Sequence, residues 1–328
     1  MPLKICHWTM FNQSGMNRVA ETLVAGEKAL GLDSHLCNIQ ENPLKAFESM
    51  GDADIHVSHT HFPDQFRKMI TKPFKLVWIS HGTPENVFNS SVVDGTKGGY
   101  GAGDAWMLMQ HWMKVADARV TFWPRHQAIL QSMADKRTTV HLVPLGIDKT
   151  FWKPVPSLGK FTGSPSLFTC ENCHPIKWPL DLFIAWPWVY PKLKGNPCLH
   201  CIYLPTNSHR WFFPLVNANG ASYASHISSA VWPNETMRNA FVSNDYSIGL
   251  VQKGDFNRVS LEANACGTKT ISYEGNPYSD FWVPEGDQRI IADRLVKILN
   301  GEVEPRKKDP IPDAADTAVA MKAIYESL

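Results

Sequence analysis

The chain has 328 residues, of which 44% are hydrophobic and 19% charged, which is the composition of a folded protein large enough for two domains. The formal net charge of +1 lacks the basic excess that proteins living on nucleic acid usually carry. The N-terminus does not read as a signal peptide and no run reaches the roughly 18 apolar residues of a membrane span, so we expect a cytoplasmic protein without a transmembrane segment.

The first half of the chain alternates short apolar runs with helical patterns. Residues 3–8 predict a strand, and residues 19–30 carry apolar side chains at helical spacing. Five further short apolar runs predict strands at residues 34–39, 53–58, 75–80, 118–122 and 139–144. Strands separated by helices predict a parallel sheet with crossover helices.

The second half repeats this pattern after a proline-containing linker at residues 144–156. The predicted elements beyond the linker are strands at 166–170, 198–204, 247–251 and 268–272 and helices at 178–189 and 257–265. We therefore predict an α/β protein with two Rossmann-like domains, residues 1–150 and 151–328, whose parallel sheets face each other across a ligand-binding cleft. The alanine-rich helix predicted at 314–328 is expected to pack back on the first domain.

The stretch from Gly249 to Ser272 carries the clearest functional pattern. An apolar run leads into a turn, a helix opens there, and the helix ends in Ala-Cys-Gly before the next strand. Backbone N–H groups at a helix opening suit an anion or a sugar hydroxyl. Glu262, about one and a half turns into the helix, can accept both hydroxyls of a ribose; a helix-pairing or solvated glutamate is the alternative.

This pattern resembles the signature of the retaining GT-B glycosyltransferases of family GT4, in which a Glu-Gly-Phe-Gly turn precedes a helix reading Leu-Glu-Ala-Met-Ala-Cys-Gly. Residues 261–267 read Leu-Glu-Ala-Asn-Ala-Cys-Gly. The resemblance implies the GT-B fold and a Glu262 that holds the ribose of a nucleotide-sugar donor.

The turn before this helix departs from the family. Phe256 matches its aromatic residue, but the first Glu of the family falls on Gly254 and the second glycine on Asn257. Asp255 is the nearest substitute for the missing carboxylate. In the family these groups contact the transferred sugar, so the resemblance implies donor contacts at Asp255, Phe256 and Asn257 and leaves the sugar open.

Two places in the first half extend the resemblance. Gly15 lies in a turn similar to the family's N-terminal glycine turn, where a donor phosphate or the acceptor approaches the backbone; an ordinary strand-to-helix turn is the alternative. Residues 77–84 are similar to the strand end that carries the family's active-site histidine, which implies that role for His81. His59 and His61 follow an earlier strand and are candidates for the acceptor side; surface-loop histidines are the alternative.

The basic pair that binds the diphosphate in the family is half present. Lys177 matches its lysine, whereas its arginine position falls on Glu171 or Asn172. Arg258, near the helix opening, is a candidate replacement. These cations would meet the charge that develops on the departing diphosphate.

The linker also resembles the family. Residues 143–148 read Val-Pro-Leu-Gly-Ile-Asp, similar to the Pro-Asn-Gly-Val-Asp that ends the family's N-terminal domain. Gly146 is then expected to permit a tight turn, and Asp148 to cap the segment after it.

Four of the seven cysteines form a CxxC…CxxC pattern: Cys170, Cys173, Cys198 and Cys201. Four thiolates at such spacing can bind zinc. However, the 24 residues between the pairs read as a helix, and Cys198 and Cys201 fall in a strand, where side chains three residues apart face opposite sides. We therefore favour reduced cysteines and no metal site, with zinc as the alternative.

Together these features predict an enzyme that transfers a sugar from a nucleoside-diphosphate sugar, its co-substrate, to a hydroxyl acceptor. The resemblance implies retention at the anomeric carbon and no metal or other cofactor. A nucleotide-sugar epimerase of the same fold and a non-catalytic protein that binds sugar or nucleic acid are the alternatives.

The acceptor stays open between a glycan, a lipid and a hydroxymethylated DNA base. The 12 tryptophans would permit base stacking, but the near-neutral charge does not favour DNA. Residues 65–75 combine basic and apolar side chains, typical of an amphipathic surface helix that could contact a membrane.

Overall fold

The structure, a computed structural model, divides the chain into two compact units. It describes residues 3–9, 15–38, 51–59, 68, 70–81, 102–135, 138–159, 161–170, 180–203, 223–227, 232–250 and 258–328. Unit 1 comprises Met1–Asp148 and Pro312–Leu328, and unit 2 comprises Lys149–Ile311. Each unit has its own sheet and its own apolar core.

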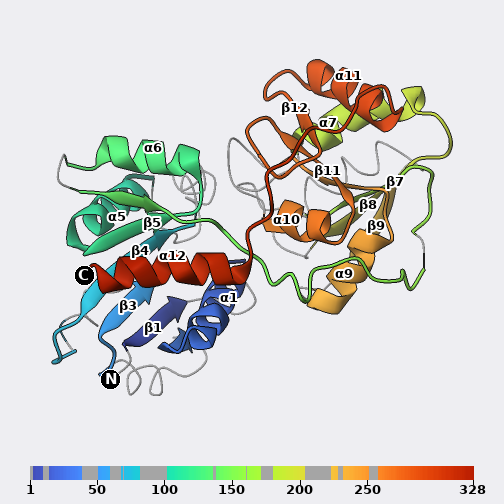
Figure 1. Cartoon of the computed structure of the whole chain (residues 1–328). Coiled ribbons are helices and arrows are strands. Elements are labelled where there is room, and N and C mark those ends of the chain that lie inside the picture. Colours follow the sequence, from blue (N-terminus) through green and yellow to red (C-terminus); the bar gives the residue numbers. More distant parts are fainter. Residues whose placement is uncertain are drawn as a thin grey trace. The chain divides into compact units, whose positions relative to one another are not determined.

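Unit 1 is built on a parallel sheet whose described strands lie in the order β2-β1-β3-β4-β5-β6; Figure 1 labels β1, β3, β4 and β5 of this sheet. These strands are β1 (Lys4–Thr9), β2 (Asp33–Asn38), β3 (Ile55–Ser58), β4 (Lys75–Ser80), β5 (Ala118–Thr121) and β6 (Val140–Leu142). The inner strands β3 and β5 are buried at every position, because parallel sheets are covered on both faces. The strand order reverses at β1, and α/β proteins bind ligands at such switch points.

The helices of unit 1 come from both ends of the chain. Within the described residues they are α1 (Gly15–Ala29), α5 (Ala102–Val115), α6 (Pro124–Met133) and α12 (Ala314–Glu326). The last of these packs against α1 (Figure 1). The two helices approach closely because small residues meet there: a Cβ added to Gly26 would lie 2.9 Å from the Cβ of Ala318.

Gly146 lies beside Asp313, where the chain returns to unit 1. Glycine is required there by the close approach of two backbones and not by the predicted tight turn. A Cβ at this position would lie 2.0 Å from the carbonyl oxygen of Asp313, so only glycine fits. The Gly146 N–H donates to Thr317 Oγ1 at 2.8 Å, and that hydroxyl donates to the Pro144 carbonyl at 2.8 Å. Gly146 therefore allows two backbones to approach and does not adopt a positive φ.

Unit 2 has a second parallel sheet, with its described strands in the order β12-β11-β10-β7-β8-β9. The strands are β7 (Ser166–Thr169), β8 (Cys198–Tyr203), β9 (Tyr223–Ile227), β10 (Tyr246–Gly249), β11 (Lys269–Tyr273) and β12 (Phe281–Val283). In chain order within the unit this is the 3-2-1-4-5-6 arrangement of Rossmann folds. Its switch point lies between β7 and β10.

Helices and aromatic side chains complete unit 2. In the part of unit 2 that the structure describes, the helices are α7 (Leu180–Val189), a 3₁₀ turn (Tyr190–Lys192), α9 (Asn234–Val242), α10 (Arg258–Ala265) and α11 (Gln288–Leu299). Helix α7 packs against α11, and Phe183 and Trp186 of α7 are fully buried in the core. Helix α10 ends at Ala265, and Gly267, two residues later, has a φ of +87° that lets the Thr268 N–H return to the Ala263 carbonyl.

The prediction of an amphipathic helix at residues 65–75 is wrong for residues 70–75. Residues 70–74 are not helical, and Lys75 begins β4. Lys72 forms an ion pair with Asp54 at 2.8 Å, and Lys75 lies 3.6 Å from Asp117, so acidic groups of unit 1 neutralise these cations. Among the described helices, none combines the length and the apolar character needed to cross a bilayer.

Candidate functional site

Three histidines lie at the carboxyl ends of adjacent strands in unit 1. His7 is in the second half of β1, His59 directly follows β3, and His81 directly follows β4. These strands are neighbours in the parallel sheet, so their carboxyl ends meet at one edge, beside the switch point. The fold therefore brings together the predicted His81, the predicted His59 and a residue that sequence reasoning missed, His7.

The three imidazole rings form a hydrogen-bonded chain. His7 Nδ1 lies 2.9 Å from His59 Nε2, and His59 Nδ1 lies 2.8 Å from His81 Nε2. His7 is fully buried and His59 almost so, whereas His81 is partly exposed. His59 is thus not a surface-loop residue, because it is buried. It contacts the partly exposed His81 through a hydrogen bond.

At their buried end, the hydrogen-bonded histidines contact a glutamate, Glu27. Glu27 of α1 places Oε2 2.8 Å from His7 Nε2, and the same oxygen accepts a hydrogen bond from Ser34 Oγ at 2.6 Å. Its other oxygen, Oε1, accepts one from the Tyr325 hydroxyl of α12 at 2.7 Å. We call Glu27, His7, His59 and His81 the histidine relay.

The electrostatics of the relay follow from its burial. Burial opposes the ionisation of Glu27, but the charge of His7 and the hydrogen bonds that the carboxylate accepts outweigh it, and the Glu27 pKa is lowered. Burial, then the charges of His81 and His7, holds the pKa of His59 well below its ordinary value. Glu27 is therefore ionised and His59 neutral near pH 7.

On α10, Glu262 and Arg258 form an ion pair. Arg258 Nε donates to Glu262 Oε1 at 2.8 Å, and the side chain of Glu262 is only 2% exposed. Both residues lie on the helix that follows β10, at the switch point of the unit 2 sheet. Beside them, burial and then the Glu262 charge raise the pKa of the Cys266 thiol to about 12.

Of the remaining predicted site residues, the structure describes Gly15 and leaves five others outside its described residues. Gly15 is exposed and is the first residue of α1, where an added Cβ would meet no atom within 4 Å. The others lie outside the described residues, and they are His61, Lys177, Asp255, Phe256 and Asn257.

The described cysteines of the CxxC pattern belong to two adjacent strands of the unit 2 sheet, where Thr169, the residue before Cys170, pairs with Cys201. Cys198 begins β8, and Cys201, three residues on, belongs to the apolar core. Cys170 follows β7 and is partly exposed, and Cys173 lies outside the described residues. Within the described part of the chain no disulfide is formed.

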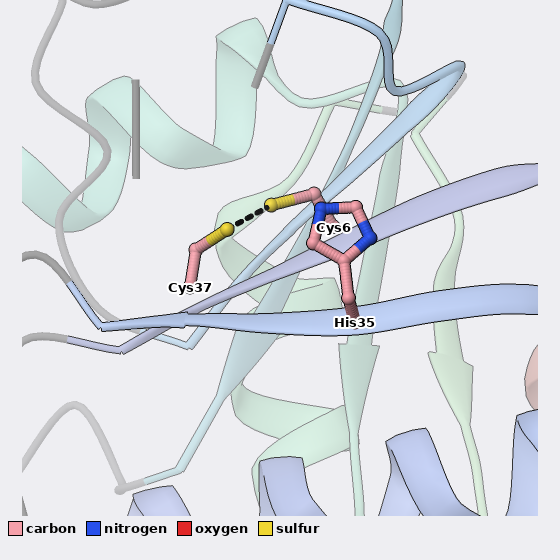
Figure 2. Close-up of side chains that lie close together, drawn as sticks. All are labelled: Cys6, His35 and Cys37. Atoms are coloured by element: carbon pink, nitrogen blue, oxygen red, sulfur yellow. Dashed lines mark hydrogen bonds between the residues drawn. The ribbon is translucent and has the colours of Figure 1, made fainter. Parts of the chain in front are cut away.

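A different set of cysteines comes together in unit 1. Cys6 of β1 and Cys37 of β2 place their sulfur atoms 2.9 Å apart, with His35 beside them (Figure 2). All three ligand atoms lie within 4.8 Å of one another. Burial raises the pKa of the Cys6 thiol well above its ordinary value, and Cys6 donates a hydrogen bond to Cys37 within the core of unit 1.

Sequence comparison identifies no relative: no protein-family model matches the chain, and neither does any curated protein. Solved structures do match. Sucrose-phosphate synthase from Thermosynechococcus elongatus gives a TM-score of 0.72 at 14% identity, over 99% of this chain and 98% of that chain. HepE from Anabaena, solved with UDP and glucose, gives 0.66 at 13% identity, over 99% and 100%. The lipopolysaccharide outer core galactosyltransferase WaaB gives 0.61 at 12% identity over 100% of both chains. The chain therefore has the two-domain GT-B fold of these proteins.

Proposed function

We propose that this chain is a glycosyltransferase that moves a sugar from a nucleoside-diphosphate sugar to a hydroxyl group. The observation that carries the proposal is the switch point of unit 2, where β7 and β10 are adjacent and α10 follows β10. Nucleotides bind at the carboxyl ends of such strands, beside the opening of the next helix. HepE, which shares the fold, is solved with UDP-glucose, and this supports a UDP-sugar as the first donor to test.

On this proposal Glu262 holds the ribose of the donor. It lies one turn into α10, and its pairing with Arg258 supports an ionised carboxylate that can accept hydroxyl hydrogen bonds. Arg258, whose Nε donates to Glu262, would contribute positive charge beside the diphosphate. Lys177, Asp255, Phe256 and Asn257 remain proposed donor contacts by resemblance.

His81 is the proposed contact to the transferred sugar. It is the partly exposed member of the histidine relay and lies at a strand end near the unit 1 switch point. Gly15, at the start of α1, is the proposed place where the backbone meets the donor phosphate or the acceptor. Transfer would proceed with retention in the cytoplasm, without metal or other cofactor, to a glycan, a lipid or a DNA base.

The first experiment measures nucleotide release from a panel of UDP-, GDP-, ADP- and CMP-sugars together with the shift in melting temperature that each produces. We expect one donor to raise the melting temperature and to be slowly hydrolysed. Glu262→Gln keeps the shape of the side chain but removes the charge that pairs with Arg258 and meets the ribose. It should weaken donor binding by about tenfold or more, the cost of one charge-assisted hydrogen bond.

Glu304→Gln is the matched control, because Glu304 is an exposed glutamate in unit 2, outside every helix and strand. It should bind the donor like the wild type. Conversion of the donor to an epimer without nucleotide release would replace the proposal with the epimerase alternative. A melting temperature unmoved by every donor would contradict the proposal altogether.

A further inference from the structure

Two cysteines and a histidine of β1 and β2 gather at one place in unit 1. In the register of these parallel strands Cys6 pairs with His35, and Trp8, two residues after Cys6, pairs with Cys37. Paired residues face the same side of a sheet, as do residues two apart along one strand, so Cys6, His35 and Cys37 share a face. The two sulfur atoms and a ring nitrogen of the histidine lie within 4.8 Å of one another (Figure 2).

The burial of these groups determines which ion would fit between them. Cys6 is fully buried and Cys37 almost so. Two thiolates carry two negative charges, and an uncompensated charge inside a protein is costly. A divalent cation bound by two thiolates and a neutral imidazole gives a site without net charge. Zinc takes these ligand types, so the set favours Zn²⁺ over Cu(I), which would leave one negative charge in the core.

A disulfide fits the two cysteines less well than a shared ion. Cys6 and Cys37 are diagonal partners across two strands, since Cys37 pairs with Trp8. Strands about 4.8 Å apart, with a rise of about 3.3 Å per residue, place the Cα atoms of such partners roughly 8 Å apart. A disulfide requires about 4.4–6.8 Å between Cα atoms. The backbone would therefore have to move to form one, whereas an ion can bridge the longer distance.

Binding of the ion would replace the hydrogen bond between the two thiols. Their sulfur atoms lie 2.9 Å apart. Zn–S bonds are about 2.3 Å long, so at a tetrahedral angle the two sulfur atoms would have to move apart. Two S–H bonds break, two Zn–S bonds and one Zn–N bond form, and two protons pass to solvent.

The neighbouring histidine His56 is not a ligand of this site. It pairs with Cys6 from the other side, in β3. Trp8 Nε1 donates to His56 Nδ1 at 2.9 Å, so the ring is neutral and carries its hydrogen on Nε2. His35, by contrast, is partly exposed and belongs to β2, at the edge of the described sheet. An ion can enter past His35, and solvent can supply a fourth ligand there.

We propose that Cys6, His35 and Cys37 bind one Zn²⁺ ion that joins β1 to β2. These residues lie on the opposite face of the sheet from His7, which neighbours Cys6 in β1. No step of the proposed sugar transfer runs through the ion. Because the folded sheet brings the three ligands together, the ion stabilises unit 1, and the melting temperature should rise with the concentration of free zinc.

The test uses the untagged full chain, reduced and treated with a chelator, and Co²⁺ as a coloured substitute for Zn²⁺. We expect one Co²⁺ ion per chain with thiolate-to-cobalt charge-transfer absorption, which added Zn²⁺ abolishes. His35→Gln and Cys37→Ser should each weaken Co²⁺ binding by about a hundredfold or more, since losing even an outer partner of a ligand costs about 10- to 100-fold. His35 is partly exposed, so His35→Gln serves as the test if Cys37→Ser does not fold.

His141→Gln is the matched control for the histidine, because His141 is also a partly exposed strand residue and lies in β6, at the other edge of the described sheet. Cys201→Ser is the control for the thiols, because it removes a buried cysteine of the CxxC pattern in unit 2. Both variants should bind Co²⁺ like the wild type.

Three results would overturn the proposal. They are a chain that binds no Co²⁺, bound Co²⁺ without thiolate absorption, and equal binding by the wild type and His35→Gln. Binding that is lost in Cys201→Ser and kept in Cys37→Ser would place the metal at the CxxC pattern instead. The titration needs no nucleotide sugar, so its outcome is independent of whether the chain transfers one.

Discussion

At the scale of single residues, the sequence predicted the partly exposed end of the relay and missed its buried end. His81 and His59 follow apolar runs, and a histidine at the end of a predicted strand is a recognisable signal. Glu27 and Tyr325 are 298 residues apart, and nothing local to either indicates that they meet. His7 lies inside a strand, where the expected role of a side chain is packing.

His56, a buried histidine of the unit 1 sheet, should contribute to the loss of stability in acid. His56 of β3 accepts a hydrogen bond from Trp8 Nε1 at 2.9 Å, and burial, then the charges of His35 and Lys72, lower its pKa to about 4. Between pH 6.5 and about 4 the unfolded chain binds a proton that the folded chain does not. The free energy of unfolding should therefore fall by about 3 kcal/mol as the pH drops through this range.

The measurement is urea unfolding at a series of pH values for the wild type and His56→Gln. The glutamine can accept the hydrogen bond from Trp8 but cannot titrate. Its stability should therefore decline less between pH 6.5 and 4. If the free energies of unfolding of the two proteins fall in parallel between pH 6.5 and 4, His56 does not contribute to the loss of stability in acid.

At the scale of elements, most strands were predictable because buried strands of parallel sheets are short apolar runs. β4 was predicted at its observed bounds, Lys75–Ser80. Helix α11 (Gln288–Leu299) was not predicted, although its buried residues recur at helical spacing and Asp287 caps its start. β12, with three residues, was missed because so short a run carries no periodicity.

The crossing of α1 and α12 gives an element-level prediction. Gly26→Val should lower the free energy of unfolding by about 1–3 kcal/mol, because the added atoms would overlap Ala318 and the Ala314 carbonyl of α12. Replacing a glycine inside a helix with alanine or valine ordinarily stabilises the helix. A lower free energy of unfolding for Gly26→Val would therefore indicate overlap with α12.

Urea unfolding measures this effect, with Gly15→Ala as the comparison on the same helix. An added Cβ at Gly15 meets nothing within 4 Å, so that variant should lose no stability. A Gly26→Val protein as stable as the wild type would mean that the two helices do not approach as closely as described.

At the scale of the whole molecule, unit 1 is assembled from two segments separated by all of unit 2. The second segment supplies α12, whose buried face includes Met321 and Tyr325. Unit 2 is continuous, with a core of its own. The two units should therefore respond differently when the second segment is removed.

A chain ending at Ile311 should keep a folded unit 2 and lose the native form of unit 1. Limited proteolysis should digest residues 1–148 and spare residues 149–311, and adding a peptide of residues 312–328 should restore protection. A chain lacking only Ser327 and Leu328, which follow α12, is the control and should resist digestion like the wild type. Equal protection of unit 1 in both truncated chains would contradict this assignment.

The contact between Tyr325 and Glu27 also sets an order of events on the ribosome. Residues 149–311 are synthesised between the two segments of unit 1, which at 5–20 residues per second takes roughly 8–30 s. Throughout that interval the nascent chain carries Glu27 and the three histidines without α12, so their surroundings are incomplete. A chain whose translation stops before α12 would thus lack the Tyr325 hydroxyl that bonds to Glu27, and the site would be complete only once α12 has been made.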